Sequence, residues 1–202
     1  MQNSKRLRDF VVAMTRLVER DAADEAVMLK QGGALVADLV AHDDWLPQEF
    51  ACADARNYCQ CLLHCDPLER FSVVSFVCEP GFTVPIHDHT VWGLIGLLRG
   101  AERCVKYAPP NGGKPLIITA DHIVAAGEVD SVSPAVGDIH AVSNARADCT
   151  SVSIHVYGAN IGAVKRHVYD AGTGDTKPYL SGYSNMGTPN FWGHHAESTP
   201  LG

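Results

Sequence analysis

The sequence predicts an α+β fold in which N-terminal helices pack on an antiparallel β-barrel of the jelly-roll type. Near the N-terminus, apolar side chains recur every three or four positions, which is typical of amphipathic helices. From residue 57 the chain changes to short runs of β-branched and aromatic residues separated by turn-forming residues, which is typical of strands. Many short antiparallel strands favour a closed or nearly closed barrel, because closure removes free sheet edges and encloses a pocket.

The length of 202 residues suits one domain, over 1–202, with enough chain to bury a sizeable core. Within this domain the change of pattern predicts a helical segment over 1–56 and a barrel over 57–170. The tail over 171–202 is rich in Gly, Ser, Pro and Asn, and is predicted to be irregular chain laid over the barrel.

Three helices are predicted ahead of the barrel. The second runs from about Ala22 to Ala41 and is expected to be interrupted at Gly32 and Gly33, because glycine is costly in a helix interior. Pro47 suits the first turn of a short third helix, where its missing N–H is not needed. The apolar stripe of the first helix consists of Leu7, Phe10, Val11, Met14, Leu17 and Val18.

Ten strands are predicted in the barrel region. They are expected at Tyr58–Cys65, Phe71–Cys78, Pro85–His87, Val91–Leu98, Glu102–Tyr107, Ile117–Thr119, His122–Ala125, Asp138–Ser143, Thr150–Tyr157 and Arg166–Tyr169.

The composition excludes several classes of partner. A formal net charge of −7 gives no basic surface, so nucleic acid and anionic membranes are not expected as partners. The longest apolar run, Val91–Leu98, is far shorter than the roughly 20 residues of a spanning helix. The start of the chain shows no signal peptide, and the 7 cysteines are an odd number. We therefore expect reduced thiols and a cytoplasmic protein; the sequence leaves the oligomeric state open.

Two histidines alternate in a segment with strand character. His87 and His89 lie two residues apart, so in a strand their imidazoles share a face while Asp88 points to the other. A third imidazole, His140, lies in a second cluster, three residues after Gly137 and four before Asn144. Three such imidazoles can hold a divalent ion on one face and leave the opposite positions open. Imidazole ligands alone would accept iron, zinc, copper or nickel.

The two clusters together resemble the paired motifs of the cupin superfamily. The usual cupin pattern has a glutamate in the first motif, and its place falls at Gly93 by spacing. The resemblance therefore narrows to cupins with three histidines, and the run from His87 to Thr90 is similar to the opening of the cysteine dioxygenase (thiol dioxygenase) family. This resemblance covers about residues 44–169 and implies an iron(II) ion held by His87, His89 and His140.

The resemblance also implies a catalytic row on one late strand. The family has a serine, a histidine and a tyrosine at alternate positions, and Ser153, His155 and Tyr157 match them. In the family, the tyrosine hydroxyl lies near the bound substrate and oxygen, and the serine and the histidine orient it. Many animal members cross-link this tyrosine to a cysteine, whose position aligns with Gly93 here, so no cross-link is expected. An ordinary polar strand, or a hydrolase with Ser153 as nucleophile, is the competing interpretation; no nucleophile turn surrounds Ser153.

The residue expected to bind the substrate carboxylate differs from that of the better-known members of the family. They hold the substrate carboxylate with an arginine on an early strand, and that position is Gln60 here. This resembles the bacterial branch associated with 3-mercaptopropionate dioxygenase and leaves Arg166 as the expected carboxylate partner, since a guanidinium offers two parallel donors. The expected reaction adds both atoms of O₂ to the sulfur of a small thiol, 3-mercaptopropionate ahead of L-cysteine, and gives a sulfinate.

Two rival functions stay open at the level of sequence. One is a cupin isomerase or hydrolase that uses another metal, and the other is a non-enzymatic cupin that binds a metal or ligand. A zinc site of Cys59, Cys61 and Cys65 with His64 is disfavoured, because no second pair of cysteine ligands completes it. His194 and His195 are expected to be tail residues rather than ligands.

Overall fold

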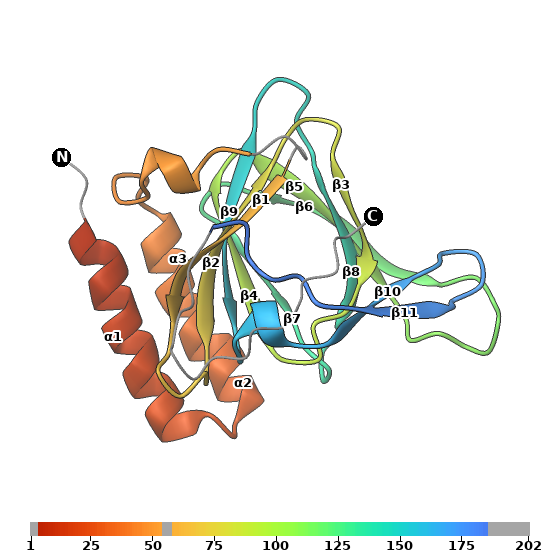
Figure 1. Cartoon of the computed structure of the whole chain (residues 1–202), viewed down its shortest axis with the longest axis horizontal. Coiled ribbons are helices and arrows are strands. Elements are labelled where there is room, and N and C mark those ends of the chain that lie inside the picture. Colours follow the sequence, from red (N-terminus) through yellow and green to blue (C-terminus); the bar gives the residue numbers. More distant parts are fainter. Residues whose placement is uncertain (1–3, 54–57, 186–202) are drawn as a thin grey trace.

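The computed structural model describes residues 4–53 and 58–185. Figure 1 shows the long helix α1 (Ser4–Asp21) and α3 (Gly33–Val40) together on one side of the β-structure. The other helical elements are α2 (Glu25–Val27), the π-helical turn η1 (Met28–Gly32), and the 3₁₀ turns η2 (Gln48–Phe50) and η3 (Ile161–Ala163). The strands are β1 (Tyr58–Cys65), β2 (Ser72–Cys78), β3 (Thr83–His87), β4 (Gly93–Arg99), β5 (Ala101–Tyr107), β6 (Ile118–Ala125), β7 (Val129–Val132), β8 (Ile139–Asn144), β9 (Ser151–Tyr157), β10 (Arg166–Tyr169) and β11 (Thr176–Tyr179).

The strands form two antiparallel sheets. One has the order β1-β2-β9-β4-β7 and the other β11-β10-β3-β8-β5-β6. The predicted fold class is confirmed: the structure has antiparallel sheets with N-terminal helices packed on them. The expected closure of the barrel is wrong, because each hydrogen-bond ladder stays within its own sheet. At Gly100 (φ +76°) the chain turns from β4 in one sheet to β5 in the other, and the ladder ends at that corner.

Two glycines let the helices lie close to the five-stranded sheet. A β-carbon on Gly32 would lie 2.8 Å from Leu94 Cδ1, and one on Gly96 would lie 2.5 Å from Val36 Cγ1. The predicted interruption at Gly32 and Gly33 is also wrong: both residues have helical dihedrals, and the π-helical turn that ends at Gly32 leads directly into α3, which begins at Gly33. Packing against the sheet outweighs the low helix propensity of glycine. The stripe residues Phe10, Met14, Leu17 and Val18 are buried in the main core as predicted.

The strand predictions need three corrections. The separate strands expected at 117–119 and 122–125 are one strand, β6, because Asp121 lies on its exposed side and pairs with Arg103 of β5. The four-residue strand β7 was not predicted. Part of the segment 171–202, expected to be irregular, forms β11, an edge strand in which Pro178 is tolerated because one side needs no donor.

A segment over residues 181–185 lies along β1, the edge strand of the five-stranded sheet. The backbone N–H of Gln60 donates to Ser184 Oγ (2.9 Å), and the N–H of Ser184 donates to the carbonyl of Gln60 (2.7 Å). The side-chain amide of Asn185 bonds both the N–H (2.8 Å) and the carbonyl (2.9 Å) of Leu62. Residues 184 and 185 thus hydrogen-bond the edge of this early strand at Gln60 and Leu62.

None of the described helices has the length and apolar character that crossing a membrane requires. No disulfide joins any of the cysteines, all of which lie in the described part of the chain.

Candidate metal centre

Three imidazoles meet between β3 and β8. His87 ends β3, His89 follows it, and His140 is the register partner of His87 on β8. One ring nitrogen from each lies within 4.8 Å of the others, and the ring centroids are 4.8 to 4.9 Å apart. All three side chains are buried. The structure thus brings together the three predicted metal ligands.

Asp88 lies on the opposite face, as the alternation predicts. Its carboxylate accepts hydrogen bonds from the backbone N–H of His167 (2.8 Å), from His167 Nδ1 (2.9 Å) and from the Tyr169 hydroxyl (2.7 Å). These contacts anchor β3 to β10 and fix the direction in which the two flanking imidazoles point.

Each imidazole has a partner at its Nδ1 atom. For His87 it is the carbonyl of Pro85 (2.9 Å), and for His89 it is Asp138 Oδ1 (3.1 Å). His140 Nδ1 lies 3.4 Å from Cys104 Sγ. Partners at one ring nitrogen orient the ring and leave the other as the ligand atom, so Nε2 is the atom available to a metal on all three rings.

Sequence reasoning did not assign Asp138 a role. Its carboxylate also accepts from the backbone N–H groups of His89 (3.0 Å) and Thr90 (2.8 Å), so it holds the turn after the second histidine. The available signal was its place two residues before His140, next to Gly137 in the second motif.

Burial keeps these imidazoles neutral. It lowers the pKa of His87 to about 4, with a further contribution from the Arg166 cation, and it holds the pKa values of His89 and His140 well below the usual range. A neutral imidazole offers the lone pair that a metal needs, without first losing a proton.

Position 93 has no room for a carboxylate ligand. A β-carbon on Gly93 would lie 2.9 Å from Val132 Cγ2 and 3.0 Å from Cδ1 and Cε1 of Tyr157. Among the described residues the ligand set at this site is therefore three histidines, which suits a divalent transition metal.

The predicted serine, histidine and tyrosine of β9 form a hydrogen-bonded row. Ser153 Oγ lies 2.8 Å from His155 Nε2, and His155 Nδ1 lies 2.7 Å from the Tyr157 hydroxyl. The Tyr157 ring stacks on His89 with 5.3 Å between centroids, which brings the end of the row to the metal site. Burial raises the pKa of Tyr157 above its ordinary value and lowers that of His155 to about 3, so both groups are neutral near pH 7.

A buried carboxyl that sequence reasoning missed lies at the other end of this row. Glu102 Oε1 accepts hydrogen bonds from Ser151 Oγ (2.9 Å) and Ser153 Oγ (3.1 Å), and the side chain is only 2% exposed. Burial raises the pKa of Glu102 to about 7. No pattern in the sequence marks this residue, since a lone glutamate near a strand start is usually exposed.

Gln60 and Arg166 reach the same pocket from β1 and β10. The Gln60 side-chain amide donates to Ser181 Oγ (3.0 Å) and to the carbonyl of Gly182 (2.8 Å). Arg166 is 3% exposed, donates to Ser181 Oγ (2.5 Å), and lies with its guanidinium 4.8 Å from the centre of the Tyr179 ring. Arg166 Nε has no hydrogen-bond partner within the described ranges.

The pocket itself is small, with a volume of ≈ 30 Å³. Its walls combine the polar groups above with apolar side chains. They are Gln60, Phe76, Val84, His87, His140, Val142, His155, Tyr157, Arg166 and Tyr179. No carboxylate is among these lining residues, and Arg166 brings a positive charge to the pocket, while the Asp138 carboxylate lies against His89.

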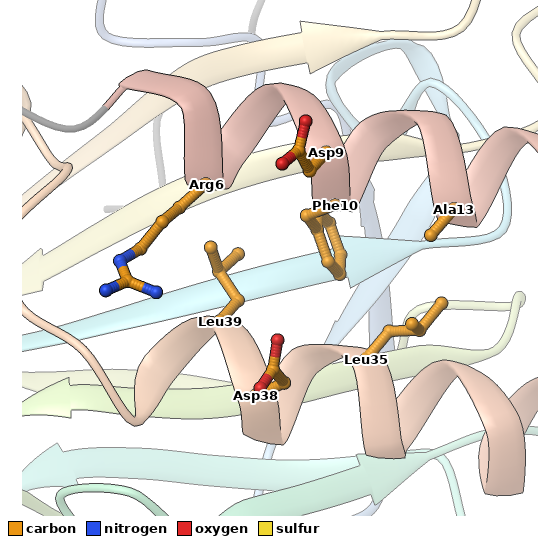
Figure 2. Close-up of a pocket in the computed structure, with 7 residues that line it drawn as sticks. All are labelled: Arg6, Asp9, Phe10, Ala13, Leu35, Asp38 and Leu39. Atoms are coloured by element: carbon orange, nitrogen blue, oxygen red, sulfur yellow. The ribbon is translucent and has the colours of Figure 1, made fainter.

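A second group of possible metal ligands and a second pocket lie outside this site. Cys104, His122 and Asp130 could hold an ion by distance, but Asp130 is already bonded to the Lys106 ammonium (2.8 Å). A pocket of ≈ 200 Å³ lies between α1 and α3, where Phe10, Leu35 and Leu39 are flanked by charged side chains (Figure 2). His194 and His195 lie outside the described residues.

No family model matches the chain. Similar solved structures include a protein with a double-stranded β-helix domain from Klebsiella pneumoniae, at 19% identity over 57% of this chain and 84% of that one, with a TM-score of 0.43. A cupin superfamily protein from Desulfitobacterium hafniense has 13% identity over 59% of this chain and 94% of that one, with a TM-score of 0.43. Oxalate oxidase in complex with the substrate analogue glycolate has 17% identity over 61% and 62%, with a TM-score of 0.45. Each of these likenesses covers only part of the chain.

Proposed function

We propose that the chain is a cytoplasmic, non-haem iron(II) thiol dioxygenase. It adds both atoms of O₂ to the sulfur of a small thiol carboxylate, 3-mercaptopropionate ahead of L-cysteine, and gives a sulfinate. One observation carries the proposal: a cluster of three buried neutral imidazoles borders a pocket that two of them, His87 and His140, line together with Tyr157 and Arg166.

The residues present fit an iron(II) ion. His87, His89 and His140 would hold it through Nε2, since each Nδ1 has another partner. With three neutral ligands the ion keeps its full double charge, and when bound it lowers the pKa of a coordinating thiol and supplies the site where O₂ is activated.

Arg166 supports the choice of a thiol carboxylate. Its guanidinium is buried beside His87, and its Nε donor has no partner among the described residues. A substrate carboxylate in the pocket would accept that hydrogen bond and pair with the cation, a combination worth roughly 1.5–3 kcal/mol. Gln60 borders the same space, but its N–H donors are bonded to Ser181 and Gly182, so its free contribution to substrate is the amide oxygen.

Tyr157 supports an oxidation at sulfur within this pocket. Its hydroxyl keeps its proton near neutral pH because burial raises its pKa, so it can donate a hydrogen bond to a group that gains negative charge. His155 holds the hydroxyl in place through Nδ1. The apolar walls Phe76, Val84 and Val142 exclude water from the space opposite the imidazoles.

The test is metal analysis combined with O₂ uptake. The full-length chain loaded with Fe²⁺ should consume one O₂ per thiol, and ¹⁸O₂ should place two labelled atoms in the sulfinate. Arg166→Gln should raise KM for thiol carboxylates and leave a thiol without a carboxylate unaffected. Full iron occupancy without thiol-dependent O₂ uptake would contradict the proposal, and favour another cupin reaction or a binding protein.

A further inference from the structure

The carboxyl group of Glu102 lies at the inner end of the row formed by Ser153, His155 and Tyr157. Its Oε1 atom is 3.1 Å from Ser153 Oγ, so the hydrogen bonds run without a gap from the carboxyl to the tyrosine hydroxyl. The other oxygen, Oε2, is buried and has no hydrogen-bond partner within the described residues. A buried carboxylate with so few donors is poorly solvated, which favours its protonated form.

The groups that face Glu102 from the packed elements are uncharged near pH 7. The thiol of Cys78 on β2 and that of Cys104 on β5 have their pKa raised to about 12 by burial. From β9 come Ser151 and Ser153, with neutral His155 and Tyr157 beyond them. The register neighbours on the two adjacent strands are Asn144 and Val124. Further along the same face of β5, the Lys106 ammonium is paired with Asp130.

A row of this kind has two possible directions of donation. With Glu102 ionised, the Ser153 hydroxyl donates to Oε1, His155 donates from Nε2 to Ser153, and the Tyr157 hydroxyl donates to Nδ1 of His155. With Glu102 protonated, every bond reverses: the carboxyl donates to Ser153, Ser153 to Nε2, and Nδ1 to the tyrosine oxygen. The second state holds one proton more than the first, and that proton is on Glu102.

Only in the second state can the tyrosine hydroxyl donate a hydrogen bond into the pocket. In the first state that proton is used in the bond to His155, so Tyr157 can offer the pocket only an acceptor. In the second state the hydroxyl donates toward the space between His87 and Arg166.

We propose that Glu102 is a positioning residue: its protonation sets the direction of the row and so decides whether Tyr157 donates into the pocket. The step moves hydrogen bonds and takes up one proton, with no other change of charge. A pKa of about 7 for Glu102 places the change near neutral pH.

The direct test reads the tautomer of His155 by ¹⁵N NMR of histidine-labelled, full-length chain, without metal and with Zn²⁺ as a diamagnetic ion. The proton on His155 should lie on Nδ1 in more than about nine tenths of molecules at pH 5.5, and on Nε2 in a similar share at pH 8.5. In Glu102→Gln the tautomer should be the same at both pH values, because an amide does not titrate in this range.

Two serine variants distinguish an effect of Glu102 on His155 that passes through the hydrogen-bonded row from a general effect of the Glu102 charge. Ser153→Ala removes the link between Glu102 and His155, so the tautomer should become independent of pH. Ser151→Ala removes a donor to Glu102 but leaves the row intact, so the dependence should remain and move to higher pH. These variants also keep the test decisive if Glu102→Gln does not fold.

The proposal would be overturned if the His155 tautomer did not change with pH in the unmodified chain. It would also be overturned if the tautomer of Ser153→Ala changed with pH as much as that of the unmodified chain. The consequence for turnover rests on the proposed function. In the unmodified protein, kcat with a thiol should fall above about pH 7. In Glu102→Gln this fall of kcat should be absent. If no thiol is oxidised but the tautomer follows pH, the role of Glu102 stands and the proposed function fails.

Discussion

Gly93 on β4 and Tyr157 on β9 are register partners, and the ring of the tyrosine fills the space that a side chain at position 93 would need. The same ring stacks on His89, so the backbone at Gly93 and the imidazole together fix its position. Among the described residues, the side chain that hydrogen-bonds the hydroxyl and orients it is His155. Glycine at this position also provides no sulfur for a thioether, so the tyrosine is held by contact and not by a covalent bond.

Gly93→Ala should displace the Tyr157 ring and lower turnover with a thiol. We expect a loss of about 1–3 kcal/mol in the free energy of unfolding, as for other overpacked sites. Gly96→Ala is the matched control, since its β-carbon would meet Val36 of α3 instead. Urea denaturation and steady-state O₂ uptake of both variants check this: equal stability loss with turnover unchanged in Gly93→Ala would show that the ring position does not matter.

His140→Ala should lose most bound iron and all thiol-dependent O₂ uptake while the chain stays folded. Removing one of three ligands leaves two imidazoles, whereas the core is built mainly from apolar residues elsewhere. His122→Ala, at a half-exposed imidazole bonded to Asp130, is the control and should keep its iron. Metal content by mass spectrometry decides, and full occupancy in His140→Ala would remove this residue from the ligand set.

Tyr157→Phe should keep iron and lower kcat by roughly 10²-fold or more, because it removes a positioned hydrogen-bond donor from the pocket. The phenyl ring preserves the stacking on His89, so stability should change little. Iron content, unfolding and O₂ uptake are measured on the same preparation. Unchanged turnover would make the row on β9 purely structural.

3-Mercaptopropionate should have a kcat/KM about tenfold or more above that of L-cysteine, equivalent to about 1.4 kcal/mol. The ammonium of L-cysteine would lose its hydration beside the Arg166 cation, and no carboxylate lines the pocket to receive it. Gln60→Arg is a less clean test than the two substrates, because it also removes the amide that bonds residues 181 and 182. O₂ uptake with both thiols at neutral pH checks which has the higher kcat/KM. A preference for L-cysteine would make it, and not 3-mercaptopropionate, the favoured substrate.

Glu102→Gln should stabilise the chain at high pH. The folded pKa of about 7 lies above the ordinary 4.5, so between these values the folded chain keeps a proton that the unfolded chain releases. The contribution from protonation is therefore full below about pH 4.5 and is lost as pH rises through 7, a change of roughly 3 kcal/mol. Urea denaturation at pH 5 and pH 8 should show the advantage of the variant growing with pH. The exposed Glu128→Gln is the control; the same trend there would assign the effect to net charge.

The sequence predicted the parts of the site that follow from local periodicity. His87 and His89 meet at one site while Asp88 bonds to β10, as alternation in an extended segment predicts, and β1 begins and ends at the predicted residues. The second cluster marked His140 as a third imidazole. Both predictions depend on a few neighbouring residues, whereas the pairing of His140 with His87 depends on how β3 and β8 meet.

The parts that could not be predicted depend on which strands face each other. Glu102 meets Ser151 and Ser153 across separations of 49 and 51 residues, and nothing in the pattern of β5 marks its acid as buried. Gln60 meets Ser181 across 121 residues. The strand β11 was missed because its proline argues against pairing, an objection that does not hold at a sheet edge.

The contact of residues 184 and 185 with β1 also bears on how the protein behaves at high concentration. An edge strand with open N–H and carbonyl groups is a template on which another chain can add a strand and start aggregation. At Gln60 and Leu62 these groups are bonded to the chain's own later residues, with the Asn185 amide in the place that a neighbouring strand would take. Loss of that contact would leave these N–H and carbonyl groups open at the edge of the sheet, and pairing with another chain through this edge would compete with the native fold.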